Sequence, residues 1–90
     1  MVEYVEYLLD KAYRSYRVWC KKNRYIYDQP SSDLDSFYRY RGHDYIILQN
    51  HNRILRGYRV VEVEHGDDRL KAVSHQFAGV ILEHGEEVEI

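Results

Sequence analysis

The stretch "VEYVEYLLDKAYRSYRVWCKKNRYIY" (residues 2–27) decides how the rest of the chain can fold. Its apolar residues recur at every third or fourth position: Val5, Leu8, Leu9, Ala12, Tyr16, Trp19 and Ile26. That spacing predicts one long amphipathic helix, which buries its apolar side and exposes the other. Acidic residues fall in its first half and basic residues in its second half, as the helix dipole favours.

The sequence changes character after this helix. Residues 28–36, "DQPSSDLDS", hold the only proline and a cluster of turn formers, so we expect a linker there. Short runs rich in β-branched and aromatic residues follow, separated by turn-forming residues. We expect strands at 37–41, 44–49, 53–64, 69–73, 79–83 and 87–90. Gly57, inside the third of them, predicts a bulge or a bend.

The predicted fold class is α+β. A long N-terminal amphipathic helix is followed by a five- or six-stranded antiparallel sheet that is strongly bent or forms a small barrel, because such closure removes exposed strand edges. The apolar stripe of the helix would cover one open side of the sheet. A chain of 90 residues makes one domain, so helix, linker and β-meander (37–90) are expected to form a single unit over residues 1–90.

The same short pattern occurs twice, as "EHGDD" (64–68) and "EHGEE" (83–87). Each copy falls between two expected strands, and glycine beside acidic residues favours a turn. Successive turns of a meander alternate between the two ends of the sheet, so these two turns would share one end. The shared end would carry an acidic patch made of Glu64, Asp67, Asp68, Glu83, Glu86 and Glu87.

Few features of the sequence indicate chemistry. His65 and His84 lie among these acids, but turns lack the rigid ligand spacing of a metal site and there is no Cys/His cluster. Cys20 falls at the edge of the helix's apolar stripe, where an inert core thiol is favoured over a reactive one. His43 precedes an aspartate at a strand start, where a structural role is favoured. We therefore expect no metal, no cofactor and no catalytic residue, and hence no enzyme.

The compartment is indicated by what the sequence lacks. Cys20 is the only cysteine, so no intramolecular disulfide can form. The N-terminal stretch has no basic region followed by a long apolar run, which a secretory signal would need. No stretch approaches the roughly 18 apolar residues of a membrane span. We expect a cytoplasmic protein with no membrane partner.

Charge is distributed unevenly along the chain, whose net charge is −2. Residues 1–60 hold eleven Lys/Arg against seven Asp/Glu, and residues 61–90 hold two against eight. The densest block, 11–27, has six basic residues and no acid. Together with two nearby tyrosines, these residues form the candidate binding surface: Lys11, Arg14, Arg17, Lys21, Lys22, Arg24, Tyr13 and Tyr25.

Two functions use this surface. The first is a small non-catalytic binding module that acts through protein–protein contacts, including self-association in which the basic surface of one copy docks on the acidic patch of another. The alternative is binding of RNA or single-stranded DNA along the basic helix face, with strand tyrosines stacked on bases. The negative net charge counts against the alternative. A third interpretation is that the two charged regions merely neutralise each other within the fold.

The short run "ILRG" (54–57) is similar to a motif of Sm-like RNA-binding proteins, and a helix followed by a small bent barrel resembles their architecture. In this chain the run falls early in the sheet, and the glycine spacing of the first Sm-like motif is absent. The resemblance is therefore one of architecture alone, and it implies no family membership.

Overall fold

The computed structural model describes residues 2–31, 33–34, 36–61 and 69–88. In chain order its elements are α1 (Val2–Lys22), β1 (Ser36–Tyr40), β2 (His43–Gln49), β3 (Ile54–Val61), β4 (Arg69–Val73), α2 (His75–His84) and β5 (Glu86–Glu87). The strands form one antiparallel sheet in the order β4-β3-β2-β1-β5. The predicted α+β class with a five-stranded antiparallel sheet is confirmed. Within the described residues the sheet is open, with β4 and β5 at its two edges.

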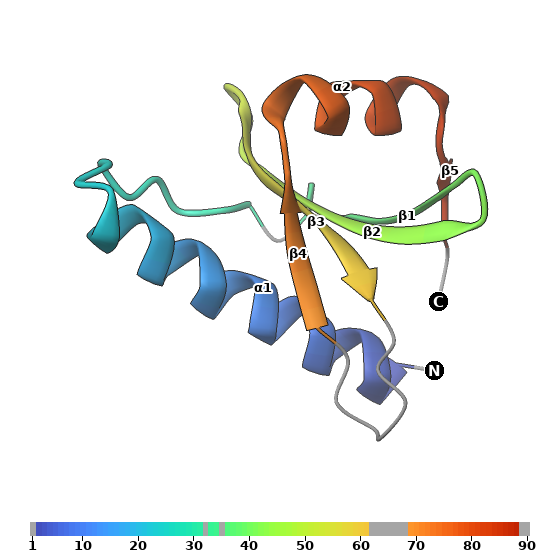
Figure 1. Ribbon diagram of the computed structural model, residues 1–90, viewed down its shortest axis with the longest axis horizontal. Helices are drawn as coiled ribbons and strands as arrows, with labels where there is room; N and C mark the ends of the chain where they lie inside the picture. Colours follow the sequence, from blue (N-terminus) through green and yellow to red (C-terminus); the bar gives the residue numbers. More distant parts are fainter. Residues whose placement is uncertain (1, 32, 35, 62–68, 89–90) are drawn as a thin grey trace.

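The molecule has three layers, because α1 packs on one face of the sheet and α2 on the other (Figure 1). Strand β2 shows why both faces are covered. Ile46 and Leu48 contact the α1 side, while Tyr45 and Ile47 contact the α2 side, and all four are buried. A strand buried on both faces reads as a continuous apolar run, which is the pattern of "YIIL".

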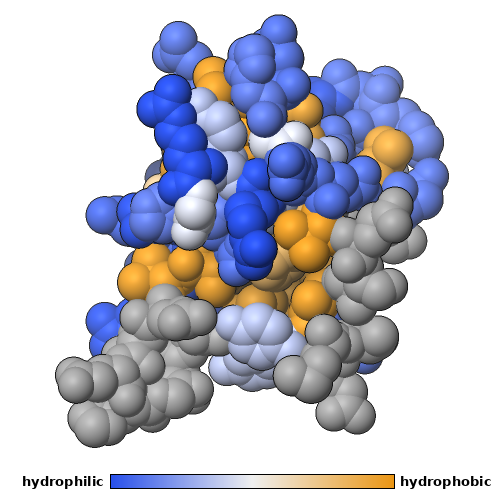
Figure 2. Space-filling view, turned by 90° about the vertical axis from the view of Figure 1, so that its right-hand side faces the viewer, coloured by the Kyte–Doolittle hydropathy of each residue, from blue (hydrophilic) through white to orange (hydrophobic). Residues whose placement is uncertain are grey.

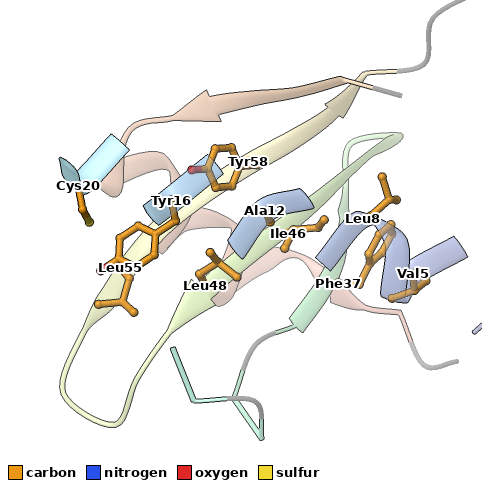
Figure 3. Close-up of a cluster of buried hydrophobic side chains, with 10 residues drawn as sticks. All are labelled: Val5, Leu8, Ala12, Tyr16, Cys20, Phe37, Ile46, Leu48, Leu55 and Tyr58. Carbon is orange, nitrogen blue, oxygen red and sulfur yellow. The ribbon is translucent and has the colours of Figure 1, made fainter. Parts of the chain in front are cut away.

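The predicted apolar stripe of α1 does cover one face of the sheet. Five of its side chains are buried: Val5, Leu8, Ala12, Tyr16 and Cys20. They line up along the side of α1 that faces the sheet (Figure 3), where they meet Phe37, Ile46, Leu48, Leu55 and Tyr58. Cys20 is a buried free thiol, as the sequence indicated.

Helix α1 ends at Lys22 and not at residue 27 as predicted. Arg24 adopts a left-handed conformation with φ 55°, and the Tyr25 N–H donates to the Cys20 carbonyl at 2.9 Å. This is the hydrogen-bond pattern of a Schellman-type helix end. Ile26 lies beyond the end and is 83% exposed, so it does not continue the apolar stripe.

The strands predicted before residue 74 agree with those of the structure. Those expected at 37–41, 44–49 and 69–73 are β1, β2 and β4, each shifted by no more than one residue. The strand expected at 53–64 is β3 over its described part.

The strand predicted at 79–83 is wrong, because these residues belong to α2. The side chain of Ser74 accepts a hydrogen bond from the Phe77 N–H at 3.1 Å and caps the helix. Ala78 and Ile81, three positions apart, are fully buried against the second face of the sheet. A short apolar run does not distinguish a strand from a buried helix segment, and the cap was the missed signal.

The predicted turn at 83–87 is also wrong. Glu83 and His84 end α2, and Glu86–Glu87 form β5, which pairs with Tyr38 and Arg39 of β1. The strand expected at 87–90 is therefore β5 in its described part. The copy of the pattern at 64–68 lies outside the described residues. The two copies thus do not form a matching pair of hairpin turns.

Gly57 has a packing role in the sheet. The register shift between β2 and β3 places Leu48 opposite Arg56 and Gln49 opposite Ile54, so the extra residue is Leu55, two positions before the predicted bulge. At Gly57 itself, an added Cβ would lie 2.9 Å from a methyl of Val73. The glycine therefore allows close approach of neighbouring side chains on the α2 face.

Candidate binding groove between α1 and the β4 edge

A groove of about 550 Å³ separates α1 from the last two strands at the β4 edge of the sheet. One wall consists of α1 residues spaced three or four apart: Lys11, Arg14, Ser15, Val18, Trp19 and Lys22. The floor comes from β3 and β4: Arg56, Tyr58, Leu70 and Ala72. We call this feature the α1–β4 groove.

The groove exists because α1 does not cover the β4 edge. The buried stripe of α1 packs over β1, β2 and β3, and the neighbouring stripe of the helix faces the open space above β4. On that side β4 presents Leu70, which is half-buried, and Ala72, which is exposed. Val18 across the groove is 57% exposed. Apolar surface is therefore left accessible on both sides of the groove.

The space-filling view in Figure 2 shows another side of the molecule. Hydrophilic side chains cover most of its upper part, and hydrophobic side chains appear as a band across its middle. Exposed apolar surface is therefore not confined to the groove, and the groove is distinguished by the polar groups described next.

Arg56 lies at the centre of the groove between aromatic rings. Its guanidinium carbon is 4.1 Å from the centroid of the Trp19 ring and 5.9 Å from that of Tyr58. Trp19 in turn packs against Tyr25, with ring centroids 4.9 Å apart. A guanidinium over an aromatic face is attracted by the ring's quadrupole, so this arrangement holds the Arg56 side chain against α1.

Two polar groups of the groove floor have no hydrogen-bond partner in the part of the chain that the structure describes. They are the Tyr58 hydroxyl, on a side chain that is 3% exposed, and the buried Nε of Arg56. Burial raises the pKa of Tyr58, and the nearby Arg56 opposes part of that rise without meeting hydrogen-bond geometry. Buried polar groups almost always have hydrogen-bond partners, and a buried group that lacks one costs about 1–3 kcal/mol of stability.

A third such atom among the described residues is Arg59 Nε. It lies elsewhere, lining a smaller hollow with His43, whose ring nitrogen is 3.1 Å from another nitrogen of the same guanidinium. Of these three atoms, only Arg56 Nε and the Tyr58 hydroxyl lie in the same groove.

The groove is cationic. Four of its lining residues are basic (Lys11, Arg14, Lys22 and Arg56), and no acidic residue lines it within the described chain. Arg14 forms an exposed ion pair with Asp10 at 2.9 Å, one turn earlier on the helix. Such a pair is weak in water and leaves the wall positively charged overall.

The predicted basic surface is divided among different parts of the structure. Three of its members, Lys11, Arg14 and Lys22, line the α1–β4 groove. Arg14 also borders a second hollow, which contains Tyr13 and Arg17, and the Arg17 guanidinium carbon lies 5.5 Å from the ring centroid of Tyr27.

The remaining members lie near the C-terminal end of α1. Arg24 and Tyr25 follow the helix and border a third hollow, and Lys21 is exposed. The floor residues Arg56, Tyr58, Leu70 and Ala72 were missed, because helical periodicity alone does not show which strand lies opposite a helix face.

The predicted stacking role of strand tyrosines does not fit two of them, because Tyr45 and Tyr58 are buried, whereas Tyr38 and Tyr40 of β1 are half-buried. Tyr45 and Tyr58 are only 4% and 3% exposed. Tyr45 packs edge-on against Phe77 of α2, with ring centroids 5.7 Å apart. Neither ring presents a face on which an unpaired base could stack.

The described members of the predicted acidic patch are Glu83, Glu86 and Glu87, and all are exposed. They lie at the end of α2 and on β5, at the sheet edge opposite β4. Glu64, Asp67 and Asp68 lie outside the described residues, and so does His65. Among the residues that are described, no group of three or more His, Cys, Asp or Glu side chains is arranged to hold a metal ion.

A hydrogen-bonded cluster fixes the end of α1 that forms one end of the groove. The Tyr16 hydroxyl donates to the Asp28 carbonyl at 3.1 Å and accepts from the Asp28 N–H at 3.3 Å. The Asp28 carboxylate forms an ion pair with Arg53 in the β2–β3 connection. Burial, assisted by a hydrogen bond to Cys20, raises the pKa of Tyr16 to about 12. The cluster ties α1, the following segment and the sheet together.

Comparison with protein-family models, curated proteins and solved structures finds no match for this chain. The similarity of "ILRG" to an Sm-like motif therefore gains no support. Across the described residues, no helix has the length and hydrophobicity of a membrane span.

Proposed function

We propose that this protein is a small non-catalytic binding module and that the α1–β4 groove takes an extended, acidic segment of a partner protein. The observation that carries this proposal is the composition of the groove beside the edge strand of the sheet, where a cationic wall faces a floor that combines the apolar Leu70 and Ala72 with Arg56 and Tyr58. Apolar contact supplies affinity, and opposite charge steers the encounter and selects the partner.

Strand β4 supports an extended conformation for the bound segment. It pairs with β3 on one side and is the last strand of the described sheet on the other. An edge strand offers backbone N–H and C=O groups to an incoming strand, a recurrent mode of peptide recognition. Alternate side chains of such a segment would point into the groove.

The charge of β4 favours an acidic partner over a second β4. A symmetric antiparallel pair centred on Lys71 would place Lys71 directly opposite its own copy, and like charges in that position are destabilising. In another copy, the acidic residues Glu86 and Glu87 lie on β5, which spans only two described residues and is too short to supply an extended segment along β4. We therefore favour a different protein as the partner, and self-association becomes an outcome of the test.

Nucleic acid remains the second candidate because four basic residues line the groove. The net charge of −2 and the burial of Tyr45 and Tyr58 favour protein over nucleic acid. We also propose that the binding module acts in the cytoplasm.

Selection from a displayed library of random peptides tests the proposal. We expect enriched sequences to alternate acidic and apolar residues and to lose affinity for the Lys22→Glu variant. The matched control is Lys21→Glu, which makes the same charge change on an adjacent exposed residue that does not line the groove. Failure to enrich any peptide, or equal loss on both variants, would overturn the proposal.

Two further measurements separate the alternatives. Anisotropy of labelled single-stranded RNA and duplex DNA at about 50 and 200 mM salt tests nucleic acid. Tight, salt-sensitive binding that Lys22→Glu abolishes, without peptide enrichment, would replace our proposal with the second candidate. Light scattering that gives a dimer mass for wild-type protein and a monomer mass for Lys22→Glu would make the second copy the partner.

A further inference from the structure

We propose that the α1–β4 groove holds a carboxylate of the bound segment between the Tyr58 hydroxyl and the Arg56 guanidinium, with glutamate as the side chain recognised. This inference rests on the proposed function and names the group that the site reads. Three observations support it. Two donors of the groove have no partner in the described structure, the strand register directs Arg56 toward the groove, and the small side chain of Ala72 leaves room for a ligand side chain to pass from β4 toward Tyr58.

The two donors match one acceptor. A phenol and a guanidinium N–H both donate, and an ionised carboxylate has two oxygens that accept. The Tyr58 side chain is 3% exposed and the Arg56 Nε is buried, and neither atom has a partner in the described structure. A carboxylate in the groove would satisfy both donors with charge-assisted hydrogen bonds, which are stronger than neutral ones.

The strand register aims Arg56 at the groove. Arg56 and Tyr58 are two positions apart in the regularly paired part of β3, opposite Leu48 and Ile46, so both face α1, and the bulge adds Leu55 to the same face. Contact with the Trp19 ring at 4.1 Å then fixes the plane of the guanidinium. The donor is therefore oriented before any ligand arrives, which reduces the entropy lost on binding.

Ala72 leaves the entrance open. It pairs directly with Tyr58 across β3 and β4, and the segment that we propose would lie on the outer side of Ala72. Neighbouring strands are about 4.8 Å apart, so that segment would be roughly 10 Å from β3. A side chain must cross Ala72 to reach Tyr58, and a methyl group allows this where a larger residue would block it. The length of the path favours glutamate over aspartate.

The surroundings favour a negative charge. The wall supplies Lys11, Arg14 and Lys22, and no acidic residue lines the groove among the described residues. The Tyr58 hydroxyl is a donor near neutral pH, because the ordinary tyrosine pKa of 10.0 lies well above that pH and burial raises the pKa of Tyr58 further. A neutral glutamine would make weaker hydrogen bonds and would not meet the cationic wall with an opposite charge.

Two end-blocked peptides provide the test, Val-Glu-Val-Glu-Val and its counterpart with glutamine at both glutamate positions. Affinity is measured by NMR titration of the full chain, which also shows whether the β4 amides respond. We expect wild-type protein to prefer the glutamate peptide, and Tyr58→Phe to reduce that preference by about tenfold, the typical effect of losing a hydrogen bond to a charged group. Arg56→Gln should reduce it as well.

A control and a stability measurement exclude a merely structural effect. Tyr45→Phe removes a hydroxyl from a buried tyrosine on the other face of the sheet and should leave the preference unchanged. Tyr58→Phe should unfold no more easily than wild type in the absence of peptide, because the hydroxyl that it removes has no partner. A marked loss of stability in Tyr58→Phe would contradict the inference.

The remaining outcomes distinguish the two proposals. If the glutamate peptide binds at β4 but Tyr58→Phe and Arg56→Gln keep the full preference, the carboxylate site is wrong and the binding module stands. If neither peptide binds and the library yields no binder, the proposed function fails and the carboxylate site fails with it.

Discussion

Gly57 of β3 and Ala78 of α2 lie so close together that a Cβ added at Gly57 would be 3.0 Å from the Cβ of Ala78. The same added atom would be 3.1 Å from a methyl of Ile47. Both distances are shorter than most contacts of a Cβ atom in folded proteins, and a methyl of Val73 would lie nearer still, at 2.9 Å. The absence of a side chain at residue 57 therefore allows the second helix to pack closely on the sheet.

Gly57→Ala should lower the free energy of unfolding by about 1–3 kcal/mol, because overpacking a buried contact forces its neighbours apart. The control is Gly79→Ala in the interior of α2. There the nearest atom, on Ile54, would be 4.0 Å from the new methyl, so there is room for it. Since alanine favours helix over glycine, this control should gain about 0.5–1 kcal/mol. Urea denaturation measures both changes, and effects of equal sign would contradict the argument.

Ser74→Ala should destabilise the protein by about 1 kcal/mol, because it removes the acceptor for the Phe77 N–H at the start of α2. A control is Ser15→Ala within α1, where alanine has the higher helix propensity and no capping bond is lost. Thermal unfolding followed by circular dichroism compares the two. A Ser74→Ala variant as stable as wild type would show that packing alone holds the first turn of α2.

The sequence predicted α1 correctly except for its C-terminal end and predicted α2 incorrectly, and the reason is physical. The apolar residues of α1 repeat over many turns, so no other period fits them. The ten residues of α2 offer only a short apolar run, and "GVIL" fits a strand equally well. The outcome depended on the second face of the sheet, where Tyr45 and Ile47 required cover. The predicted fold placed a helix on only one face of the sheet, so it did not provide cover for these two residues.

The positive charge of the candidate site could be predicted from the sequence, but the shape of the groove could not. Lys11, Arg14 and Lys22 were identified from helical periodicity. Arg56 was not, because alternation shows only that it shares a strand face with Tyr58, and which helix covers that face depends on tertiary packing. Ala72 and Tyr58 become neighbours only through strand register. Register depends on tertiary packing, so these floor residues could be found only in the folded structure.

Arg24→Gly should raise the free energy of unfolding by about 1 kcal/mol. Arg24 occupies the left-handed position at the end of α1 with φ 55°, which glycine adopts without steric strain. Arg24→Ala is the matched control, since it removes the same charge but keeps a Cβ, and it should give no gain. Chemical denaturation compares the two variants. Equal stability would show that the charge and not the backbone conformation determines the effect.

Tyr16 should make stability fall at high pH. Its pKa is raised to about 12 in the folded protein, against an ordinary value of 10.0, because burial disfavours the ionised form. Between these values the unfolded chain loses a proton that the folded chain keeps, so rising pH favours unfolding. The contribution is intact below pH 10 and is reduced by about 2 kcal/mol as the pH reaches 12.

Tyr16→Phe separates this effect from other alkaline changes. The variant should be less stable near neutral pH by about 1 kcal/mol, because both hydrogen bonds to the Asp28 backbone are lost. Between pH 10 and 12 its stability should decline less steeply than that of wild type, as followed by urea denaturation at each pH. Parallel curves would mean that Tyr16 ionises equally in the folded and unfolded chains. Burial would then not control this hydroxyl, and the cluster that fixes the end of the groove would be looser than its hydrogen bonds indicate.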